Sequence, residues 1–243
     1  MIDAYRTPGP DVAAHLRAGN GLALLPFGAL EMHGAHLPLG TDTFAALEVA
    51  RRLAEQFDAV LLPPVHYGET WLTSGYPGTV SLAPDTVTAI ATDIGRSLAA
   101  TGARRYVIVN GDFGNRAPLH AAARSLTDEG VIRAVVLDYP GMDAAIAEVR
   151  EAPSAHPMIA HAEEAETSTM LALDPETVRT DRYAADYPEF PDDFGQRPIR
   201  LDEISTTGVF GDPSRASAAK GEHILAGTVA GCAAEIERLL AAD

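Results

Sequence analysis

The chain has 243 residues, is 47% hydrophobic, and carries 34 acidic against 18 basic residues, for a net charge of −16. This charge repels nucleic acid and anionic membrane surfaces, and the composition is that of a soluble globular protein with a substantial core. A single cysteine, Cys232, cannot form an internal disulfide, and no signal-peptide pattern opens the chain, so we expect one cytoplasmic domain over residues 1–243.

Strand and helix patterns alternate along the chain. Apolar positions at helical spacing predict helices over residues 10–17, 44–57, 84–100, 118–126 and 216–240. Continuous apolar runs predict buried strands over residues 22–25, 59–62, 106–109 and 132–137. Strand, helix and strand at this spacing imply right-handed crossovers, and therefore an α/β fold: a three-layer αβα sandwich with a mostly parallel central sheet. Ligands of such sheets bind beyond the carboxyl ends of the strands.

A group of candidate metal ligands follows the first long strand. Glu31, His33, His36 and Asp42 lie within twelve residues, in a segment broken by glycine and proline. Carboxylate and imidazole are donors that divalent cations bind, and Glu31 and His33 would project to the same side of an extended backbone. The alternative is that Asp42 or Thr43 only caps the next helix.

The segment 65–82 contains the only tryptophan, two tyrosines and several glycines. These residues predict a covering loop with a hairpin. A loop of this kind after a strand also supplies the walls of small-molecule pockets, which makes Tyr67, Trp71 and Tyr76 candidates for substrate contact.

The string PFGALEMHGAHLPLGTD, residues 26–42, resembles the signature of the creatininase (creatinine amidohydrolase) family, P-x-G-S-x-E-Q-H-G-x-H-L-P-L-x-T-D. Ala29 and Met32 stand where Ser and Gln are usual. YG followed by YPGTVSL resembles a second family motif, with Thr73 where the family often has His. The resemblance implies a creatininase-like fold, metal-dependent hydrolysis of carbon–nitrogen bonds, and a homo-oligomer, which in several members is a hexamer.

The loop NGDFGN, residues 110–115, resembles the family motif N-G-H-G-G-N, whose His is a metal ligand. Asp112 and Phe113 replace His and Gly. In one interpretation Asp112 remains a ligand through oxygen and favours harder ions such as Mn²⁺, Mg²⁺ or Fe²⁺. In a second, one metal position is lost. A third is that Asp112 merely caps a turn.

The string HAEEAETSTML, residues 161–171, resembles the family's H-A-G-x-x-E-T-S-x-M-L. On this resemblance Glu166 is a metal-site carboxylate and His161 lines the active site. Without it, the segment reads as the acidic start of a helix. Glu163 stands where Gly is usual, and we expect Glu163 and Glu164 to be solvated or at the pocket rim.

The last third of the chain is less regular. Residues 174–198 are rich in Pro, Asp and Tyr and predict a long surface excursion. GVFGDPSRASAAKGEHIL, residues 208–225, resembles a further family motif, in which we interpret Asp212 and Pro213 as turn residues rather than catalytic ones.

These patterns predict one site. The expected metal ligands are Glu31, His33, Asp42, Asp112 and Glu166. The expected catalytic residues are His161 and Glu166. The expected substrate-binding residues are His36, Tyr67, Trp71, Tyr76 and Asn115. Four carboxylates in one pocket require cations, so we expect two divalent ions per chain, zinc, manganese or iron, with Asp42 able to bridge them.

The predicted activity is hydrolysis of a small cyclic amide, a formamide or a short peptide by metal-activated water. The departures at positions where the family has Ser, His and Gly argue against creatinine itself. A biosynthetic enzyme that forms an amide would need the same groups, and a non-catalytic member with a spoiled metal site is a further alternative. A nucleotide-binding protein is a weaker one, because the chain has neither a GxGxxG motif nor a P-loop.

Overall fold

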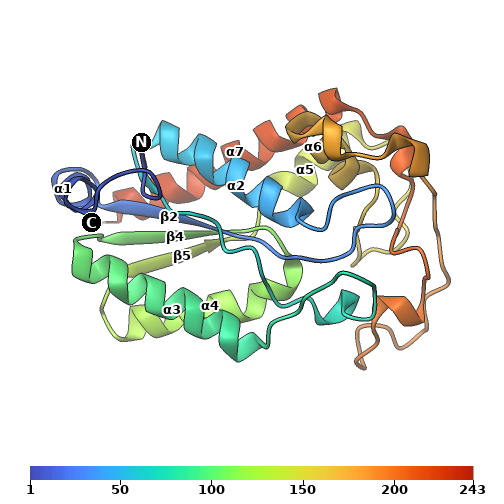
Figure 1. The fold of residues 1–243 in the computed structure, drawn as a ribbon, viewed down its shortest axis with the longest axis horizontal. Helices are drawn as coiled ribbons and strands as arrows, with labels where there is room; N and C mark the ends of the chain where they lie inside the picture. Colours follow the sequence, from blue (N-terminus) through green and yellow to red (C-terminus); the bar gives the residue numbers. More distant parts are fainter. Residues whose placement is uncertain (243) are drawn as a thin grey trace.

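A computed structural model describes residues 1–242 and contains a five-stranded sheet between two layers of helices (Figure 1). The strands lie in the order β1-β3-β2-β4-β5, and every neighbouring pair is parallel. They are β1 Ile2–Asp3, β2 Leu22–Phe27, β3 Val60–Leu61, β4 Arg105–Asn110 and β5 Arg133–Leu137. The predicted α/β sandwich is confirmed.

Two layers of helices cover the sheet (Figure 1). The helices are α1 Gly9–Ala18, α2 Thr41–Gln56, α3 Pro84–Thr101, α4 Arg116–Asp128, α5 Met142–Val149, α6 Glu164–Leu173 and α7 Ala218–Ala241. Helices α3 and α4 lie on one face, and α2 and α7 lie on the other with α5 and α6. Within residues 1–242, no helix combines the length and the apolar composition needed to cross a membrane.

The central strand β2 explains why both faces are covered. Leu22 and Leu24 point into the core beneath α2 and α7, whereas Ala23, Leu25 and Phe27 point into the core beneath α3 and α4. All of these side chains are buried, because alternate residues of a strand face opposite sides of the sheet. Burial of each large side chain contributes about 1.5–3 kcal/mol, so the strand is held from both sides.

Some details differ from the predictions. The hairpin predicted within residues 65–82 is wrong: that segment is a loop with a short 3₁₀ turn, Trp71–Thr73, and an isolated parallel bridge between Gly68 and Ser81. Helix α5 and strand β1 were not predicted as elements of regular structure, and both are short. Helix α6 lies where one interpretation of residues 161–171 placed the acidic start of a helix. Helix α2 begins at Thr41, its cap is Gly40, and no side chain caps it. The alternative in which Asp42 or Thr43 is only a helix cap is therefore wrong.

Candidate active site

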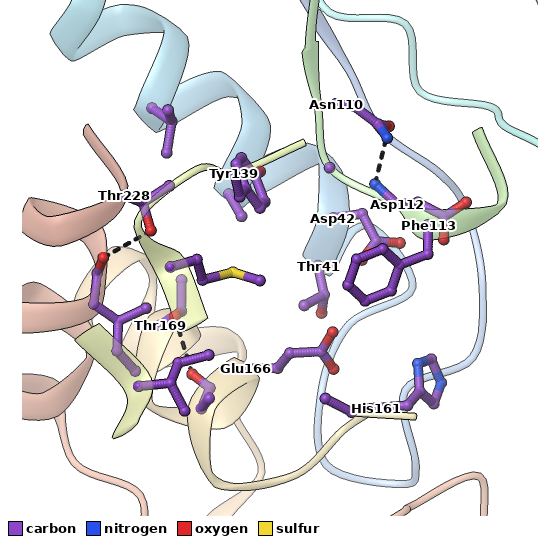
Figure 2. Close-up of a pocket in the computed structure, with 18 of the residues that line it drawn as sticks. Thr41, Asp42, Asn110, Asp112, Phe113, Tyr139, His161, Glu166, Thr169 and Thr228 are labelled. Carbon is purple, nitrogen blue, oxygen red and sulfur yellow. Dashed lines mark hydrogen bonds between the residues drawn. The ribbon is translucent and has the colours of Figure 1, made fainter. Parts of the chain in front are cut away.

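The candidate site lies where the carboxyl ends of the central strands meet the first turns of two helices. Asp42 comes from the first turn of α2 and Glu166 from the first turn of α6. Asp112 follows β4, and His161 precedes α6. Figure 2 shows the side chains of Asp42, Glu166 and His161 on one side of a shared cavity. Parallel strands bring such loops to one edge of the sheet, so residues far apart in the chain meet there.

His33 is the centre of this arrangement. Its ring is buried, and its Nδ1 lies 3.1 Å from the carbonyl oxygen of Glu31. A carbonyl only accepts, so Nδ1 carries a proton, and in the neutral form that binds a metal ion Nε2 directs its lone pair the other way. There Nε2 lies 3.2 Å from Asp42 Oδ1, 3.7 Å from Glu166 Oε2 and 3.9 Å from Glu31 Oε1. A lone pair facing three carboxylates suits a cation between them.

His161 approaches from the opposite side. Its Nε2 lies 2.7 Å from the carbonyl oxygen of Met32 and therefore donates, which leaves the lone pair of Nδ1 at 3.7 Å from Glu31 Oε1. Burial and the nearby charge of His33 lower the pKa of His161 to about 3, so its ring is neutral. The hydroxyl of Thr73 donates to the other oxygen of Glu31. The two imidazole rings are 4.4 Å apart between centroids.

Several polar atoms of the site are buried without a hydrogen-bond partner among the described residues: His33 Nε2, Asp42 Oδ2 and Asp112 Oδ2. The other oxygen of Asp112 accepts from the main-chain N–H of Gly114 at 3.2 Å. Asp112 therefore does cap a turn, yet one of its oxygens remains available. Buried polar atoms are normally paired, so an unpaired set at one place indicates a site for a ligand.

The electrostatics show the same deficit of positive charge. Burial and the charge of Asp42 raise the pKa of Glu31 to about 8, and burial raises the pKa of Glu166 to about 7. Burial, with the charges of Glu31 and Asp42, raises the pKa of Asp112 well above its ordinary value. Burial lowers the pKa of His33, but the charges of Asp42 and Glu166 more than offset this and hold it well above 6.5. Without a cation, the pocket must take up protons.

Two groups of potential ligand atoms lie close enough to hold a metal ion. One comprises Glu31, His33 and His161, and the other His33, Asp42 and Glu166, with the atoms of each group within 4.8 Å of one another. The chemistry of these donors, oxygen and imidazole nitrogen, fits zinc, manganese or iron. Asp112 belongs to neither group, although its charge interacts with theirs.

The local backbone brings these residues together. A Cβ at Gly111 would lie 2.4 Å from the carbonyl oxygen of Asp42, so only glycine lets the loop after β4 pass so close to α2. Ala162 has a left-handed backbone, with φ of +52°. In this conformation its N–H donates to Glu166 Oε2 at 2.5 Å. The carboxylate of Glu166 is thus held by the residue that follows His161.

The site opens into a cavity of about 110 Å³ with two different ends. One end carries the carboxylates and His161, and the other lies between helices α2, α5, α6 and α7 (Figure 2). The second end is lined mainly by apolar side chains, among them Val49, Met142, Ile146, Ile224 and Leu225. The cavity can therefore accept a molecule that is polar on one side and apolar on the other.

Three predicted substrate-binding residues are buried away from this cavity and have structural partners. His36 Nε2 lies 3.0 Å from the hydroxyl of Thr167, and burial lowers the pKa of His36 to about 4. The hydroxyl of Tyr76 donates to the carbonyl oxygen of Ser205 at 2.7 Å. The side chain of Asn115 bonds to the main chain of two loops. The structure does not bring these side chains to the cavity, because each holds a loop in place.

The other two, Tyr67 and Trp71, are exposed and do not line the cavity. Trp71 begins the short turn whose last residue, Thr73, bonds to Glu31. The segment 65–82 thus contributes to the site through Thr73, which stands at the position where the family often has His.

Glu163 and Glu164 were expected to be solvated or at the pocket rim; neither is solvated, and only Glu163 reaches the pocket. Glu163 lines the cavity, caps α6 by accepting from the N–H of Ala165, and pairs with Arg150 at 3.2 Å. Glu164 is 2% exposed and accepts from two main-chain N–H groups and from Lys220 Nζ at 2.5 Å. Both are buried because charged or N–H partners surround them, which a sequence pattern does not reveal.

Sequence reasoning missed Tyr139, which follows β5 and lines the cavity. Its backbone is left-handed, with φ of +51°, and its hydroxyl is buried with no hydrogen-bond partner among residues 1–242. Beside it, Asp138 accepts from Asn110 at 2.8 Å. Their position at the carboxyl end of a predicted strand was the available signal.

Comparisons with known proteins agree with this geometry. The family model described as "Creatininase: Creatinine amidohydrolase" matches residues 7–236. The chain is 37% identical to the mycofactocin precursor peptide peptidase of Mycolicibacterium smegmatis, over 95% of this chain and 90% of that protein. It is 34% identical to the creatinine amidohydrolase of Pseudomonas putida, over 90% of each chain.

Solved structures show the same likeness. A crystal structure of creatinine amidohydrolase superimposes with a TM-score of 0.87 at 31% identity, covering 98% of both chains. Two other creatininase structures at 31% identity are described as "Creatininase Mn" and, for a mutant, "Zn-Zn type". Sequence, fold and site lead to one conclusion: the chain belongs to the creatininase family of amidohydrolases, hydrolases that act on carbon–nitrogen bonds.

Proposed function

We propose that this protein is a metal-dependent amidohydrolase that cleaves a short peptide or a related small amide with activated water. The observation that carries the proposal is the position of His33 Nε2, whose lone pair faces Asp42, Glu166 and Glu31 in a buried pocket. Four acidic side chains without matching positive charge are costly to bury, and divalent ions would neutralise them.

The residues that would hold the ions are Glu31, His33, Asp42 and Glu166, with Asp112 as an additional oxygen donor. Divalent ions bound there would lower the pKa of a water molecule and polarise the amide carbonyl. The related structures described with Mn and with Zn–Zn support such ions and favour up to two per chain.

The protein's own groups would manage the proton. The carboxylate of Glu166, 3.7 Å from His33 Nε2 at the centre of the site, is positioned to take a proton from water and return it to the leaving nitrogen. His161 is neutral, with Nε2 engaged on a carbonyl, so its role is to accept at Nδ1 and to position its neighbours. The buried hydroxyl of Tyr139 can donate to the substrate.

The proposed substrate class follows from the relatives and the cavity. The relative at 37% identity is named a peptide peptidase, which supports a short peptide, and the relative at 34% a creatinine amidohydrolase. Creatinine is small and polar, whereas one end of the cavity is apolar. We therefore place a peptide-like amide first and a cyclic amide or formamide second.

Metal analysis tests the proposal. Protein purified without chelator should contain about one to two divalent ions per chain, and an Asp42→Ala variant should lose them and remain folded. Activity against a panel of short peptides and N-formyl compounds should disappear with the metal and return when Mn²⁺ or Zn²⁺ is added to the wild type. A folded wild-type protein that binds no divalent ion would instead indicate a non-catalytic member.

We also propose that the protein is a homo-oligomer, with a hexamer as the expected state. Its proposed location is the cytoplasm. Exposed apolar side chains on the loops around the sheet edge, Tyr67, Trp71, Val80 and Phe113, support self-association. Light scattering of the purified protein measures its mass directly.

A further inference from the structure

The apolar end of the cavity has no role in holding metal ions. Val49 comes from α2, Ile146 from α5, and Ile224 and Leu225 from α7, and all four side chains are buried. We call this end the apolar chamber. It adjoins the carboxylates, since Glu166 and Asp42 line the same cavity (Figure 2).

Two hydroxyl groups in the chamber are already engaged. Thr228 donates to the carbonyl oxygen of Ile224 at 2.8 Å, and Thr169 donates to that of Ala165 at 2.9 Å, each within its own helix. Neither has a proton left for a ligand. The chamber therefore presents an apolar surface, and a polar group placed there would lose its hydrogen bonds to water.

Between the chamber and the carboxylates lies Tyr139. Its hydroxyl is buried without a partner, and the charges of Asp42 and Glu166 act on it. A molecule that spans the cavity would meet the carboxylates at one end, the Tyr139 hydroxyl in the middle and apolar walls at the other. This order matches an amide with a hydrophobic substituent.

The volume limits the substituent. A cavity of about 150 Å³ holds the six carbons of a benzene ring, so about 110 Å³ has room for roughly four carbon atoms. The volume therefore admits a branched aliphatic group no larger than the side chain of valine or leucine.

We propose that the apolar chamber is a specificity pocket that binds a branched aliphatic group next to the amide that is cleaved. The inference rests on the proposed function, because the carboxylate end must hold the reacting amide. It narrows the substrate class to peptide-like amides with an aliphatic side chain beside the scissile bond.

Two metal-chelating probes that differ in one side chain test this inference. Leucine hydroxamate and glycine hydroxamate are titrated calorimetrically into the metal-loaded protein. Leucine hydroxamate should bind at least about tenfold more tightly, because its side chain buries apolar surface in the chamber. Thr228→Leu fills the chamber and should remove this preference. Thr228→Val, which keeps the shape and removes only the hydroxyl, should retain it.

A second variant enlarges the chamber instead of filling it. Ile146→Ala enlarges the chamber and should improve binding of phenylalanine hydroxamate relative to leucine hydroxamate by several-fold. It also provides a test if Thr228→Leu does not fold.

The outcomes separate the two proposals. If both hydroxamates bind equally well to the wild type, the chamber is not a specificity pocket, although the metal site stands. If neither binds to protein shown to contain metal, the proposed function fails and the chamber proposal fails with it. A leucine preference that survives Thr228→Leu and is unaffected by Ile146→Ala also overturns the chamber.

Discussion

Two carboxylates on the first turn of α6 have opposite surroundings: Glu164 is buried, whereas the side chain of Glu166 is 29% exposed and faces the cavity. Glu164 accepts from the N–H groups of Glu151 and Ala152 and from Lys220 Nζ. Glu166 accepts one N–H, from Ala162, and otherwise faces His33 and other acids. A buried carboxylate is therefore not in itself a sign of function. What distinguishes the active site is that, in the described part of the chain, no lysine or arginine pairs with the carboxylates that face one another there.

The sharpest test of this contrast is to neutralise each carboxylate in turn. Glu166→Gln should lower kcat/KM by about 10³-fold, which corresponds to about 4 kcal/mol of transition-state stabilisation, because a ligand and a proton carrier are lost. Glu164→Gln, two residues earlier, should leave kcat and metal content unchanged. Steady-state kinetics with metal analysis measure both. Equal losses in the two variants would contradict the distinction.

Glu164, in contrast, should matter for the stability of the fold. Glu164→Ala removes one of the two carboxylates that pair with Lys220 and the acceptor of two main-chain N–H groups, and should lower the free energy of unfolding by about 3 kcal/mol. Urea denaturation at neutral pH measures this. As a matched control, Glu148 pairs with His223 on the surface, and Glu148→Ala should change the free energy by less than about 0.5 kcal/mol.

The uncompensated charge should also make the metal-free protein sensitive to pH. With pKa values of about 8 for Glu31 and about 7 for Glu166, the native state keeps protons that the unfolded chain releases above about 4.5. The free energy of unfolding should therefore fall as pH rises from 5 to 8, by on the order of 6 kcal/mol. The raised pKa of His33 acts in the same direction.

Urea denaturation in the presence of chelator at several pH values measures this slope. Glu31→Gln should flatten it, and added metal should remove it, because bound ions replace the protons. A metal-free wild type whose stability rises between pH 5 and 8 would show that other groups dominate.

The smallest expected effect concerns Asp112. Asp112→Asn keeps the oxygen that accepts from Gly114 but removes the charge, and should weaken metal binding by about tenfold, or about 1.4 kcal/mol. Asp212 caps a 3₁₀ turn through the same kind of bond, to the N–H of Ser214 at 2.8 Å. Asp212→Asn should therefore leave metal affinity unchanged. Competition with a fluorescent chelator compares the two variants.

The sequence predicted the fold and the residue types of the site better than it predicted which side chains reach the cavity. Apolar runs such as that of β2 identify strands buried on both faces, and the residues just after them are the ones that meet. Glu31, His33 and Asp42 converge because they follow one such strand. Single-sequence patterns say nothing about pairing across the chain, however, so the partners that bury Glu163 and Glu164 could not be foreseen.

The same limit explains why several predicted substrate contacts do not reach the cavity. His36, Tyr76 and Asn115 lie close in sequence to functional residues, but their side chains turn toward partners in distant segments and hold loops together. Tyr139 shows the converse case. Only its position just after a predicted strand marks it, and its place in the cavity depends on a left-handed backbone that only the folded chain displays.

The left-handed alanine at position 162 has a consequence for how this enzyme can change. It turns the peptide so that the N–H of Ala162 holds the carboxylate of Glu166, and one short piece of chain carries both His161 and Glu166. New substrates can therefore be accommodated by exchanging the surrounding loops while the reactive end of the pocket is inherited as a single block.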